Sequence, residues 1–225
     1  MTFSIAARCA RTGLVGMAVS SSSPAVAARC AHARARVGAV ASQNITDPDL
    51  GPQILDRLAA GEAAEAALAA VLATHPFADF RQITVIDSKG GTALHTGAGG
   101  LGTTGASRGV DCVAAGNLLS DAAIAQRMTE TFAATAGHLG DRLLAAMQAS
   151  VDAGGEEGPV RSAGMLIYDR QPWPIVDLRV DWDEAAAPIA GLRAVWAIYK
   201  PQIDDYVVRA ENPTAAPGYG VPGDE

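Results

Sequence analysis

The run Thr2-Phe3-Ser4-Ile5-Ala6-Ala7-Arg8 alternates polar and apolar residues and starts directly after Met1. A second apolar run, Leu14 to Val19, follows the turn residues Arg11-Thr12-Gly13, and a third, Val37 to Ala41, ends in Ser42-Gln43-Asn44. Apolar runs bounded by turn residues are typical of β-strands, and the Thr-Gly turn predicts that the first two form a hairpin. We therefore expect a hydroxyl residue, Thr2, at the tip of the first strand.

Helical and strand patterns alternate along the rest of the chain. Apolar residues at helical spacing predict helices over 53–60, 62–74, 120–135, 139–153 and 183–199. Short apolar runs predict strands over 81–87, 92–96, 110–115, 162–168 and 175–182, with a glycine-rich loop at 97–109 and an exposed loop at 154–159. Strand pairs separated by helix pairs indicate sheets covered by helices. We expect one α+β domain over residues 1–200 and an extended or disordered polar tail over 201–225.

The composition limits the classes to which this protein can belong. Of its 225 residues 49% are hydrophobic but only 5% are aromatic, so the core must consist mainly of small aliphatic side chains. A net charge of −7 disfavours a nucleic-acid-binding protein. No apolar run reaches the length of a membrane-spanning helix, so no membrane partner is expected. Three cysteines without metal-like spacing predict free thiols in a reducing compartment, and hence a cytoplasmic protein.

The amino-terminal segment is basic within an acidic protein, with five arginines and no acidic residue up to Thr46. Such a segment is also typical of an organellar transit peptide, although the strand periodicity opposes that alternative. A basic segment suits an anionic substrate, and Arg29 is our candidate for binding a substrate carboxylate because guanidinium pairs with carboxylates in a planar, bidentate geometry. The open alternative is that these arginines balance carboxylates elsewhere in the fold.

The sequence contains no convincing motif for a cofactor or a metal ion. The stretch Gly97-Ala98-Gly99-Gly100-Leu101-Gly102 matches G-x-G-x-x-G by letter, but a strand pattern follows where a dinucleotide site needs a helix, so no cofactor is expected. The four histidines show neither H-x-x-x-H spacing nor clustered carboxylates, so no metal is expected. Two polar residues remain as candidates for substrate binding: His32, inside the basic segment, and Asn44, at the end of the third run.

Thr2 has a specific chemistry available if Met1 is removed. A threonine hydroxyl is a poor nucleophile, but an N-terminal threonine carries its own base, an α-amine with an ordinary pKa of roughly 7.7–8.0. That chemistry needs an amino terminus held in a cleft at the end of a strand, and the first predicted strand begins at Thr2. The alternative is that threonine stands at position two only because it permits removal of methionine.

The chain resembles the bacterial DUF1028 proteins, a group of unknown function related to the N-terminal nucleophile (Ntn) hydrolases. The matching stretches run in order from Thr2 to about Tyr199. They include Thr2-Phe3-Ser4-Ile5, Gly16-Met17-Ala18-Val19, Val37-Gly38-Ala39-Val40-Ala41-Ser42-Gln43, Gly116-Asn117-Leu118-Leu119 and Asp177-Leu178-Arg179-Val180-Asp181. The resemblance implies a four-layer αββα sandwich, in which two antiparallel sheets are flanked by helices.

The resemblance also implies a set of catalytic residues. Thr2 would be the nucleophile, with Ser21 and Gln43 close to it near the ends of the second and third strands. Proteasome-like relatives tend to hold an acidic residue and a lysine at those places, and this chain has neither there. Asn117 or a backbone N–H would donate a hydrogen bond to the developing oxyanion.

We therefore expect an amide hydrolase, an amidohydrolase in the broad sense, that cleaves a C–N bond in a peptide or a small-molecule substrate of anionic character. The alternative is a catalytically inactive relative that binds a small anionic metabolite or peptide. A third alternative is a structural or assembly protein, since alanine-rich helices support association. A homo-oligomer such as a homodimer is expected in each case.

Overall fold

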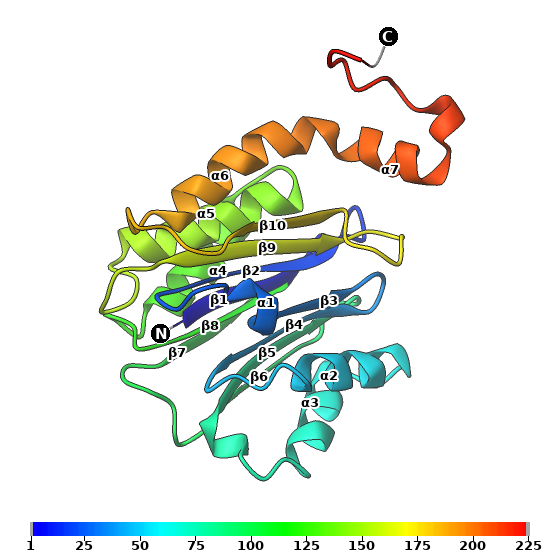
Figure 1. The fold of residues 1–225 in the computed structure, drawn as a ribbon. Coiled ribbons are helices and arrows are strands. Elements are labelled where there is room, and N and C mark those ends of the chain that lie inside the picture. The colour runs from blue at the N-terminus through cyan, green and yellow to red at the C-terminus, as the bar shows by residue number, and fades with distance from the viewer. Residues whose placement is uncertain (1, 224–225) are drawn as a thin grey trace.

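Two antiparallel β-sheets lie face to face in the computed structural model, which describes residues 2–223 (Figure 1). Within that range the larger sheet has six strands in the spatial order β10 (Val176–Val180), β9 (Ser162–Tyr168), β2 (Val15–Ser21), β1 (Thr2–Arg8), β8 (Cys112–Asn117) and β7 (Gly105–Gly109). The smaller sheet has four in the order β3 (Ala31–Arg34), β4 (Gly38–Asn44), β5 (Arg81–Asp87) and β6 (Thr92–Thr96).

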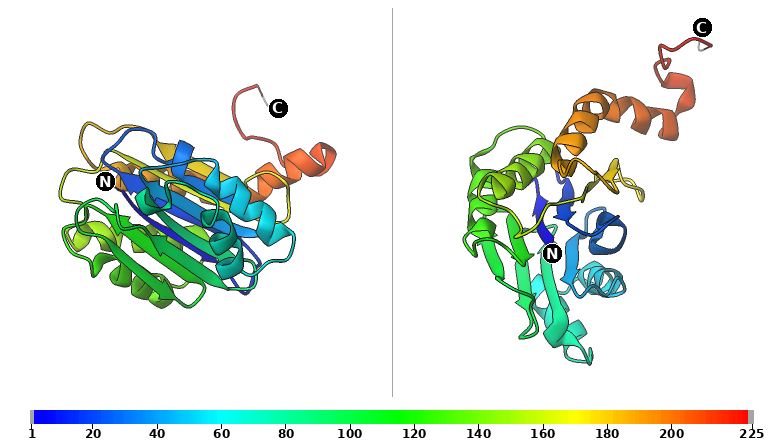
Figure 2. Two further views of the ribbon diagram at one scale, coloured as in Figure 1. Left: turned by 90° about the horizontal axis from the view of Figure 1, so that it is seen from below. Right: turned by 60° about the vertical axis from the view of Figure 1, so that its left-hand side comes forward.

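Helices cover the outer faces of both sheets. The larger sheet is covered by α4 (Ile124–Ala134), α5 (Leu139–Asp152) and α6 (Pro188–Tyr199), and the smaller by α2 (Leu50–Ala59) and α3 (Ala64–Leu72) (Figure 1). The shorter elements are α1 (Ala27–Cys30), η1 (Ala78–Phe80), η2 (Lys200–Gln202) and η3 (Pro213–Ala215). Helix α7 (Ile203–Glu211) leads away from the sheets (Figure 2). The expected α+β fold, with two antiparallel sheets and flanking helices, is confirmed.

Strand β1 is buried on both faces, and its alternating sequence reflects two different surroundings. Phe3 and Ile5 pack in the cluster between the larger sheet and its helices, whereas Ala6 packs in the cluster between the two sheets. Ser4 also points to the smaller sheet, where it hydrogen-bonds Gln43 on β4. Strands β1 and β2 form the hairpin predicted from the Thr-Gly turn. The amino-terminal strand is therefore at the centre of the fold.

Alanine, valine and cysteine side chains fill most of the space between the sheets, and Met17 and Ile86 are the larger members of this cluster. Buried members of this cluster are Ala6, Met17, Val19, Val26, Cys30, Ala39, Ala41, Ile86 and Val113. Toward the amino end of β1 the inward-facing positions become polar instead, beginning with Ser4. The candidate site is therefore continuous with the interface between the sheets.

Two strands lie where the sequence predicted none. Part of the basic segment forms β3, and residues 105–109 of the expected loop form β7 at the edge of the larger sheet. Glycines such as Gly105 led to the prediction of a loop. In the structure the glycine allows close packing within a strand, because a Cβ at position 105 would come within 2.4 Å of the carbonyl oxygen of Ala122. Residues 2–44 supply strands to both sheets, which argues against the transit-peptide alternative.

The prediction that residues 201–225 are extended or disordered is wrong for their first part. Residues 203–211 form α7, in which Ile203 is buried in the core of the larger sheet and Val207 packs against that core. Asp204 in the first turn and Arg209 in the last turn interact favourably with the helix dipole. The polar, proline-rich composition obscured this short amphipathic pattern. The domain boundary drawn at residue 200 therefore falls inside a continuous helical segment.

No helix among the described residues has both the length and the apolar character needed to cross a bilayer. Cys9, Cys30 and Cys112 are buried free thiols, as predicted. Burial raises the pKa of the Cys112 thiol to about 12, so this thiol stays protonated and unreactive at neutral pH.

Candidate functional site

Thr2 lies at the amino end of β1, between polar residues on both neighbouring strands. It pairs with Ser21 on β2 and with Asn117 on β8. Its hydroxyl donates a 3.2 Å hydrogen bond to Ser21 Oγ, and only 6% of the residue is exposed. Three of the four residues predicted to be catalytic are therefore neighbours, because β1 lies between the two strands that carry the others.

The fourth predicted catalytic residue, Gln43, lies on β4 across the space between the sheets. Its Oε1 accepts a 2.6 Å hydrogen bond from the hydroxyl of Ser4. Its Nε2 donates to Gln82 Oε1 at 2.8 Å and to the carbonyl oxygen of Ala115 at 3.2 Å. These contacts place Gln43 beside Ser4, one pleat further into the molecule than Thr2.

Gln82 on β5 completes this polar network and was not among the predicted site residues. Its Oε1 accepts hydrogen bonds from Gln43 and, at 3.2 Å, from Asn117 Nδ2, while its Nε2 donates to Thr96 Oγ1 and to the carbonyl oxygen of Gly116. A carboxamide on the inner face of a strand needs buried partners. No short-range signal marks Gln82, because the strand over residues 81–87 also carries the polar residues Arg81, Thr84 and Asp87.

Asn117 is fully buried and carries one unsatisfied atom. Its Nδ2 donates to Gln82, whereas its Oδ1 makes no hydrogen bond with any residue from 2 to 223. Leaving a buried acceptor unpaired costs about 1–3 kcal/mol, so such an atom marks a place where a donor fits. One Nδ2 hydrogen is already used, so one remains for the predicted contact with an oxyanion.

A chain of hydrogen bonds leads from Thr2 to the predicted substrate-binding residue Arg29. Ser21 Oγ lies 2.8 Å from Ser23 Oγ, and Arg29 Nη2 donates to Ser23 Oγ at 2.5 Å. Arg29 Nη1 also donates to the carbonyl oxygens of Pro24 and Ala25. The half-buried guanidinium is therefore linked to Thr2 through two serine hydroxyls, and it also holds the loop after β2.

Glu156 lies at the same end of the larger sheet and is a second residue that the sequence analysis missed. Its Oε2 accepts a 3.2 Å hydrogen bond from the backbone N–H of Ser22, and its backbone bridges to Leu119. Only 5% of Glu156 is exposed, although the flanking glycines predicted an exposed loop. The loop instead folds back on the chain after β8, where the Glu157 N–H donates to the carbonyl oxygen of Leu118. Burial raises the pKa of Glu156 to about 7.

The other two predicted substrate-binding residues have structural roles. His32 packs against α2, since a Cβ on Gly51 would lie 2.2 Å from its ring, and burial lowers the pKa of this histidine. Its ring therefore faces the helix layer rather than the space between the sheets. Asn44 holds the loop after β6: its Nδ2 donates to the carbonyl oxygen of Phe80 at 2.8 Å and its Oδ1 accepts from the Leu101 N–H at 3.1 Å.

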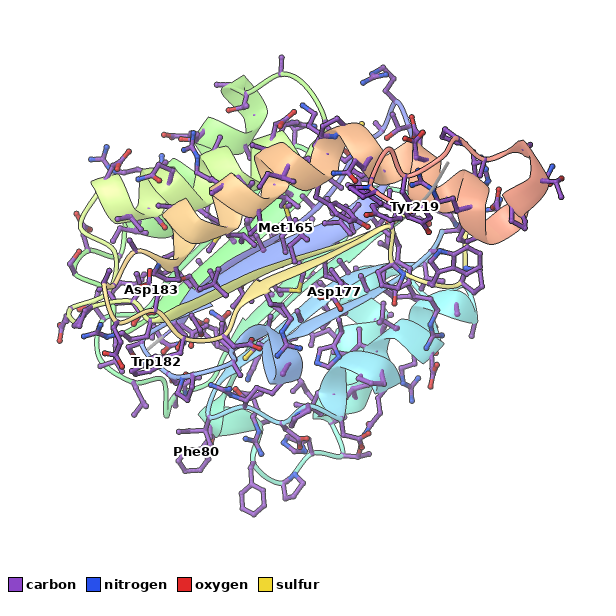
Figure 3. All side chains as sticks on the ribbon, turned by 45° about the horizontal axis from the view of Figure 1, so that its top comes forward. Phe80, Met165, Asp177, Trp182, Asp183 and Tyr219 are labelled. Atoms are coloured by element: carbon purple, nitrogen blue, oxygen red, sulfur yellow. The ribbon has the colours of Figure 1, made fainter. Side chains whose placement is uncertain are left out.

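Trp182 lies at the rim of this end of the molecule. The Arg161 N–H donates to the carbonyl oxygen of Ser21, and the Arg161 guanidinium lies 5.6 Å from the Trp182 ring. Trp182 and Asp183 lie together beyond the end of the larger sheet (Figure 3). Arg161 thus links the end of β2 to an exposed aromatic side chain, of which 48% is accessible to solvent.

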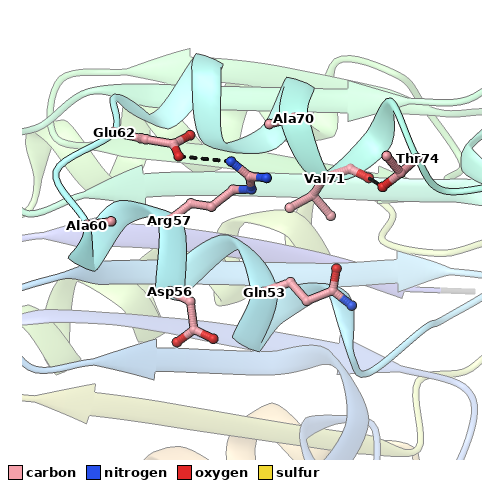
Figure 4. Close-up of a pocket in the computed structure, with 8 residues that line it drawn as sticks. All are labelled: Gln53, Asp56, Arg57, Ala60, Glu62, Ala70, Val71 and Thr74. Atoms are coloured by element: carbon pink, nitrogen blue, oxygen red, sulfur yellow. Dashed lines mark hydrogen bonds and ion pairs between the residues drawn. The ribbon is translucent and has the colours of Figure 1, made fainter.

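A separate surface pocket lies between α2 and α3, on the outer side of the smaller sheet. Its lining includes Gln53, Asp56, Thr74 and the ion pair of Arg57 with Glu62, whose charged atoms are 2.9 Å apart (Figure 4). None of the predicted site residues lines it. Residues 2–223 contain no group of three or more His, Cys, Asp or Glu side chains placed to hold a metal ion.

Comparison with known families identifies the chain. The model of a family of unknown function, DUF1028, matches residues 2–192. The chain belongs to the DUF1028 family. Among solved structures, it is similar to the crystal structure of a DUF1028 protein from Silicibacter pomeroyi, with 30% sequence identity and a TM-score of 0.82 over 92% of this chain and 91% of that chain. The resemblance to the DUF1028 family is therefore confirmed, while a search of the curated proteins gives no match.

The match of this DUF1028 protein to its family begins at Thr2 and contains every residue of the polar site described above. It ends at residue 192, within α6, so α7 lies outside the matched region. The family is described as one of unknown function, so an activity has to be argued from the chemistry of the site.

The site of this DUF1028 protein combines hydroxyls, carboxamides and one carboxyl group around the amino end of β1. The whole sequence has two lysines, Lys89 in the turn between β5 and β6 and Lys200 in η2, so a lysine beside Gln43 or Ser21 is not available as a base. If Met1 is removed, the α-amine of Thr2 itself can take a proton from the Thr2 hydroxyl, and the Glu156 carboxyl is a second titratable group at this end of the sheet.

Proposed function

We propose that this DUF1028 protein is an Ntn-type hydrolase that cleaves a C–N amide bond, with Thr2 as nucleophile after removal of Met1. The observation that carries the proposal is the buried Thr2 hydroxyl at the amino end of a central strand, between Ser21 and Asn117. In that position one residue supplies both the nucleophile and its base. The arrangement of two sheets between helical layers supports the assignment, since it agrees with the αββα sandwich that Ntn hydrolases are expected to share.

The proposed reaction proceeds through an ester on Thr2. The neutral α-amine takes the Oγ proton as Oγ bonds to the substrate carbonyl carbon, giving a tetrahedral oxyanion. The oxyanion then reforms the carbonyl and the C–N bond breaks, while the ammonium gives its proton to the leaving nitrogen, which departs as an amine. Water, deprotonated by the same α-amine, finally cleaves the ester, releasing a carboxylic acid and returning the proton to Oγ.

The neighbouring side chains have separate roles in this reaction. Ser21 orients the nucleophile through its 3.2 Å hydrogen bond with Thr2. Asn117 offers its second Nδ2 hydrogen to the oxyanion, and Gln82 holds that carboxamide in place. Arg29 is the candidate partner for a substrate carboxylate. The proposed substrate is accordingly a peptide or small amide that carries an anionic group.

The test uses a peptide epoxyketone, an electrophile that forms a ring by reacting with both the hydroxyl and the α-amine of an N-terminal threonine. We expect the intact mass of the purified protein to lack one methionine and to gain one probe, located on the first peptide. Thr2→Ala should gain none, because alanine also permits methionine removal and only the hydroxyl is lost. Thr12→Ala, at an exposed turn, is the matched control and should be labelled like the wild type.

Binding of a small anionic ligand without turnover is a second candidate function. It is favoured by the neutral Ser21 and Gln43 near Thr2, at the places where catalytic relatives are expected to hold an acidic residue and a lysine. Arg29 would then be the anchor for the ligand. Saturable binding of a carboxylate ligand that survives Thr2→Ala but is lost in Arg29→Ala, with no hydrolysis across an amide panel, would favour this function over the first.

A further inference from the structure

We propose that the carboxyl group of Glu156 binds the α-amine of Thr2 and positions that amine as the base. Glu156 acts through Thr2 and is therefore a positioning residue. The inference rests on the removal of Met1 in the proposed function, but it concerns a residue for which neither the sequence nor the family suggested a role.

The strand registers place Glu156 beyond the amino end of β1. Strand β1 is antiparallel to both of its neighbours, so it begins at the edge of the sheet where β2 and β8 end. The residues that follow Ser21 on β2 and Asn117 on β8 therefore lie beyond the same edge as the amino terminus of β1. Glu156 contacts both of these continuations, through the N–H of Ser22 and through its backbone bridge to Leu119. An α-amine on Thr2 therefore lies at the same edge of the sheet as Glu156.

Two buried oxygen atoms at this edge of the sheet lack a hydrogen-bond donor among the described residues, and an ammonium group is a donor. Glu156 Oε1 and Asn117 Oδ1 are both buried and make no hydrogen bond within residues 2–223. A primary ammonium has three hydrogens to donate. A buried carboxylate without a charged partner is strongly disfavoured, whereas a carboxylate paired with an ammonium is stabilised.

The charged groups on the surrounding elements have other partners. Arg29, on α1, donates to the loop of Ser23 and Pro24, and Arg161, before β9, donates to the carbonyl oxygens of Asp183 and Glu184. Glu157, next in the chain, is exposed. Among the described residues Glu156 forms no ion pair, so the Thr2 ammonium is the cation available to it.

The pair also explains how a neutral amine is available for catalysis. Burial raises the pKa of Glu156 to about 7, close to the ordinary pKa of an α-amine, roughly 7.7–8.0. A proton can therefore pass from the ammonium to the Glu156 carboxylate, leaving a neutral amine beside Thr2 Oγ. Two groups this close titrate as a unit, so the amine must show a pKa that depends on Glu156.

The experiment follows the ¹³Cα signal of Thr2 against pH in protein labelled with [¹³Cα]threonine, since this signal reports the charge of the α-amine. Thr2→Ser, which lacks one threonine, assigns the signal. We expect the α-amine pKa of the wild type to lie above the ordinary range, and Glu156→Gln to lower it by about one unit or more, equivalent to a tenfold change in the equilibrium. Glu157→Gln is the matched control and should titrate like the wild type.

Glu156→Asp keeps the negative charge on a shorter side chain, so the α-amine pKa of this variant should lie between those of the wild type and Glu156→Gln. This variant also tests the inference if Glu156→Gln does not fold. Equal α-amine pKa values in wild type, Glu156→Gln and Glu156→Asp would overturn the inference, as would an intact mass that retains Met1.

The two proposals fail separately in these experiments. Epoxyketone labelling of Thr2 together with an unchanged α-amine pKa in Glu156→Gln removes the role of Glu156 and leaves the hydrolase. A shifted pKa with no labelling and no hydrolysis leaves the Glu156–amine pair and removes the hydrolase.

Discussion

Ser4 on β1 donates a 2.6 Å hydrogen bond to Oε1 of Gln43 on β4, and this bond joins the two sheets one pleat behind Thr2. Away from the polar network of Gln43, Gln82 and Asn117, the interface between the sheets is built from apolar side chains, which resist separation of the sheets but do not fix their register. A buried hydrogen bond is directional, so it specifies how β1 lies against β4. The position of Thr2 relative to the smaller sheet therefore depends on a residue that takes no part in the proposed chemistry.

Ser4→Ala is predicted to lower the free energy of unfolding by about 1–3 kcal/mol, because it leaves the buried Gln43 Oε1 without its donor. Urea denaturation followed by circular dichroism measures the loss. Thr103→Ala removes an exposed hydroxyl and should change stability by less than about 0.5 kcal/mol. Equal stability of Ser4→Ala and the wild type would show that water replaces the serine hydroxyl.

Gln82→Leu is predicted to cost more, about 2–4 kcal/mol, because one change removes the acceptor of both Gln43 Nε2 and Asn117 Nδ2. The exposed Gln126→Leu serves as the control and should be nearly neutral. If the proposed function holds, epoxyketone labelling of Thr2 should also slow in folded Gln82→Leu, since Asn117 loses the partner that orients it. A variant as stable as the wild type would contradict the role assigned to this network.

Local sequence signals predicted most of the strands, but not β3 and β7, and the site only in part. Alternation and turn residues located β1 and β2, because both are short-range properties of the chain. The neighbours of Thr2 could be named because the resemblance implied which strand ends meet. Gln82 and Glu156 were missed for a different reason: burial of a carboxamide or of a glycine-flanked carboxylate depends on which segments fold over it, and no short-range pattern records that.

Gly51→Ala is predicted to destabilise the protein by about 1–3 kcal/mol, although alanine is the better helix former. The added Cβ would lie 2.2 Å from the His32 ring, so either the ring or α2 must move. In a His32→Ala background the obstacle is gone, and the same substitution should become neutral or stabilising. A double-mutant cycle by urea denaturation measures this coupling, and additive effects would contradict the packing of His32 against α2.

Asp141 is predicted to make stability depend on pH at the acidic end. Partial burial acts to raise the pKa of this carboxyl group, but hydrogen bonds from Lys200, Trp196 and the His138 N–H outweigh burial and hold the pKa below its ordinary value. A depressed carboxyl pKa stabilises the fold above the ordinary value, and that stabilisation is lost as pH falls through the folded pKa. The contacts join the start of α5 to α6 and η2, so their loss should loosen the helix layer over the larger sheet.

Asp141→Asn should therefore lower the free energy of unfolding at neutral pH by about 1–2 kcal/mol, the usual cost of losing a cap and a charged hydrogen bond. Its deficit relative to the wild type should shrink as the pH falls, because protonation removes the same carboxylate from the wild type. Asp152→Asn, exposed at the other end of α5, is the control because its carboxylate makes none of these contacts. Urea titrations across the acidic range decide the matter: a deficit for Asp141→Asn that does not change with pH would mean that the asparagine loses packing and geometry rather than charge.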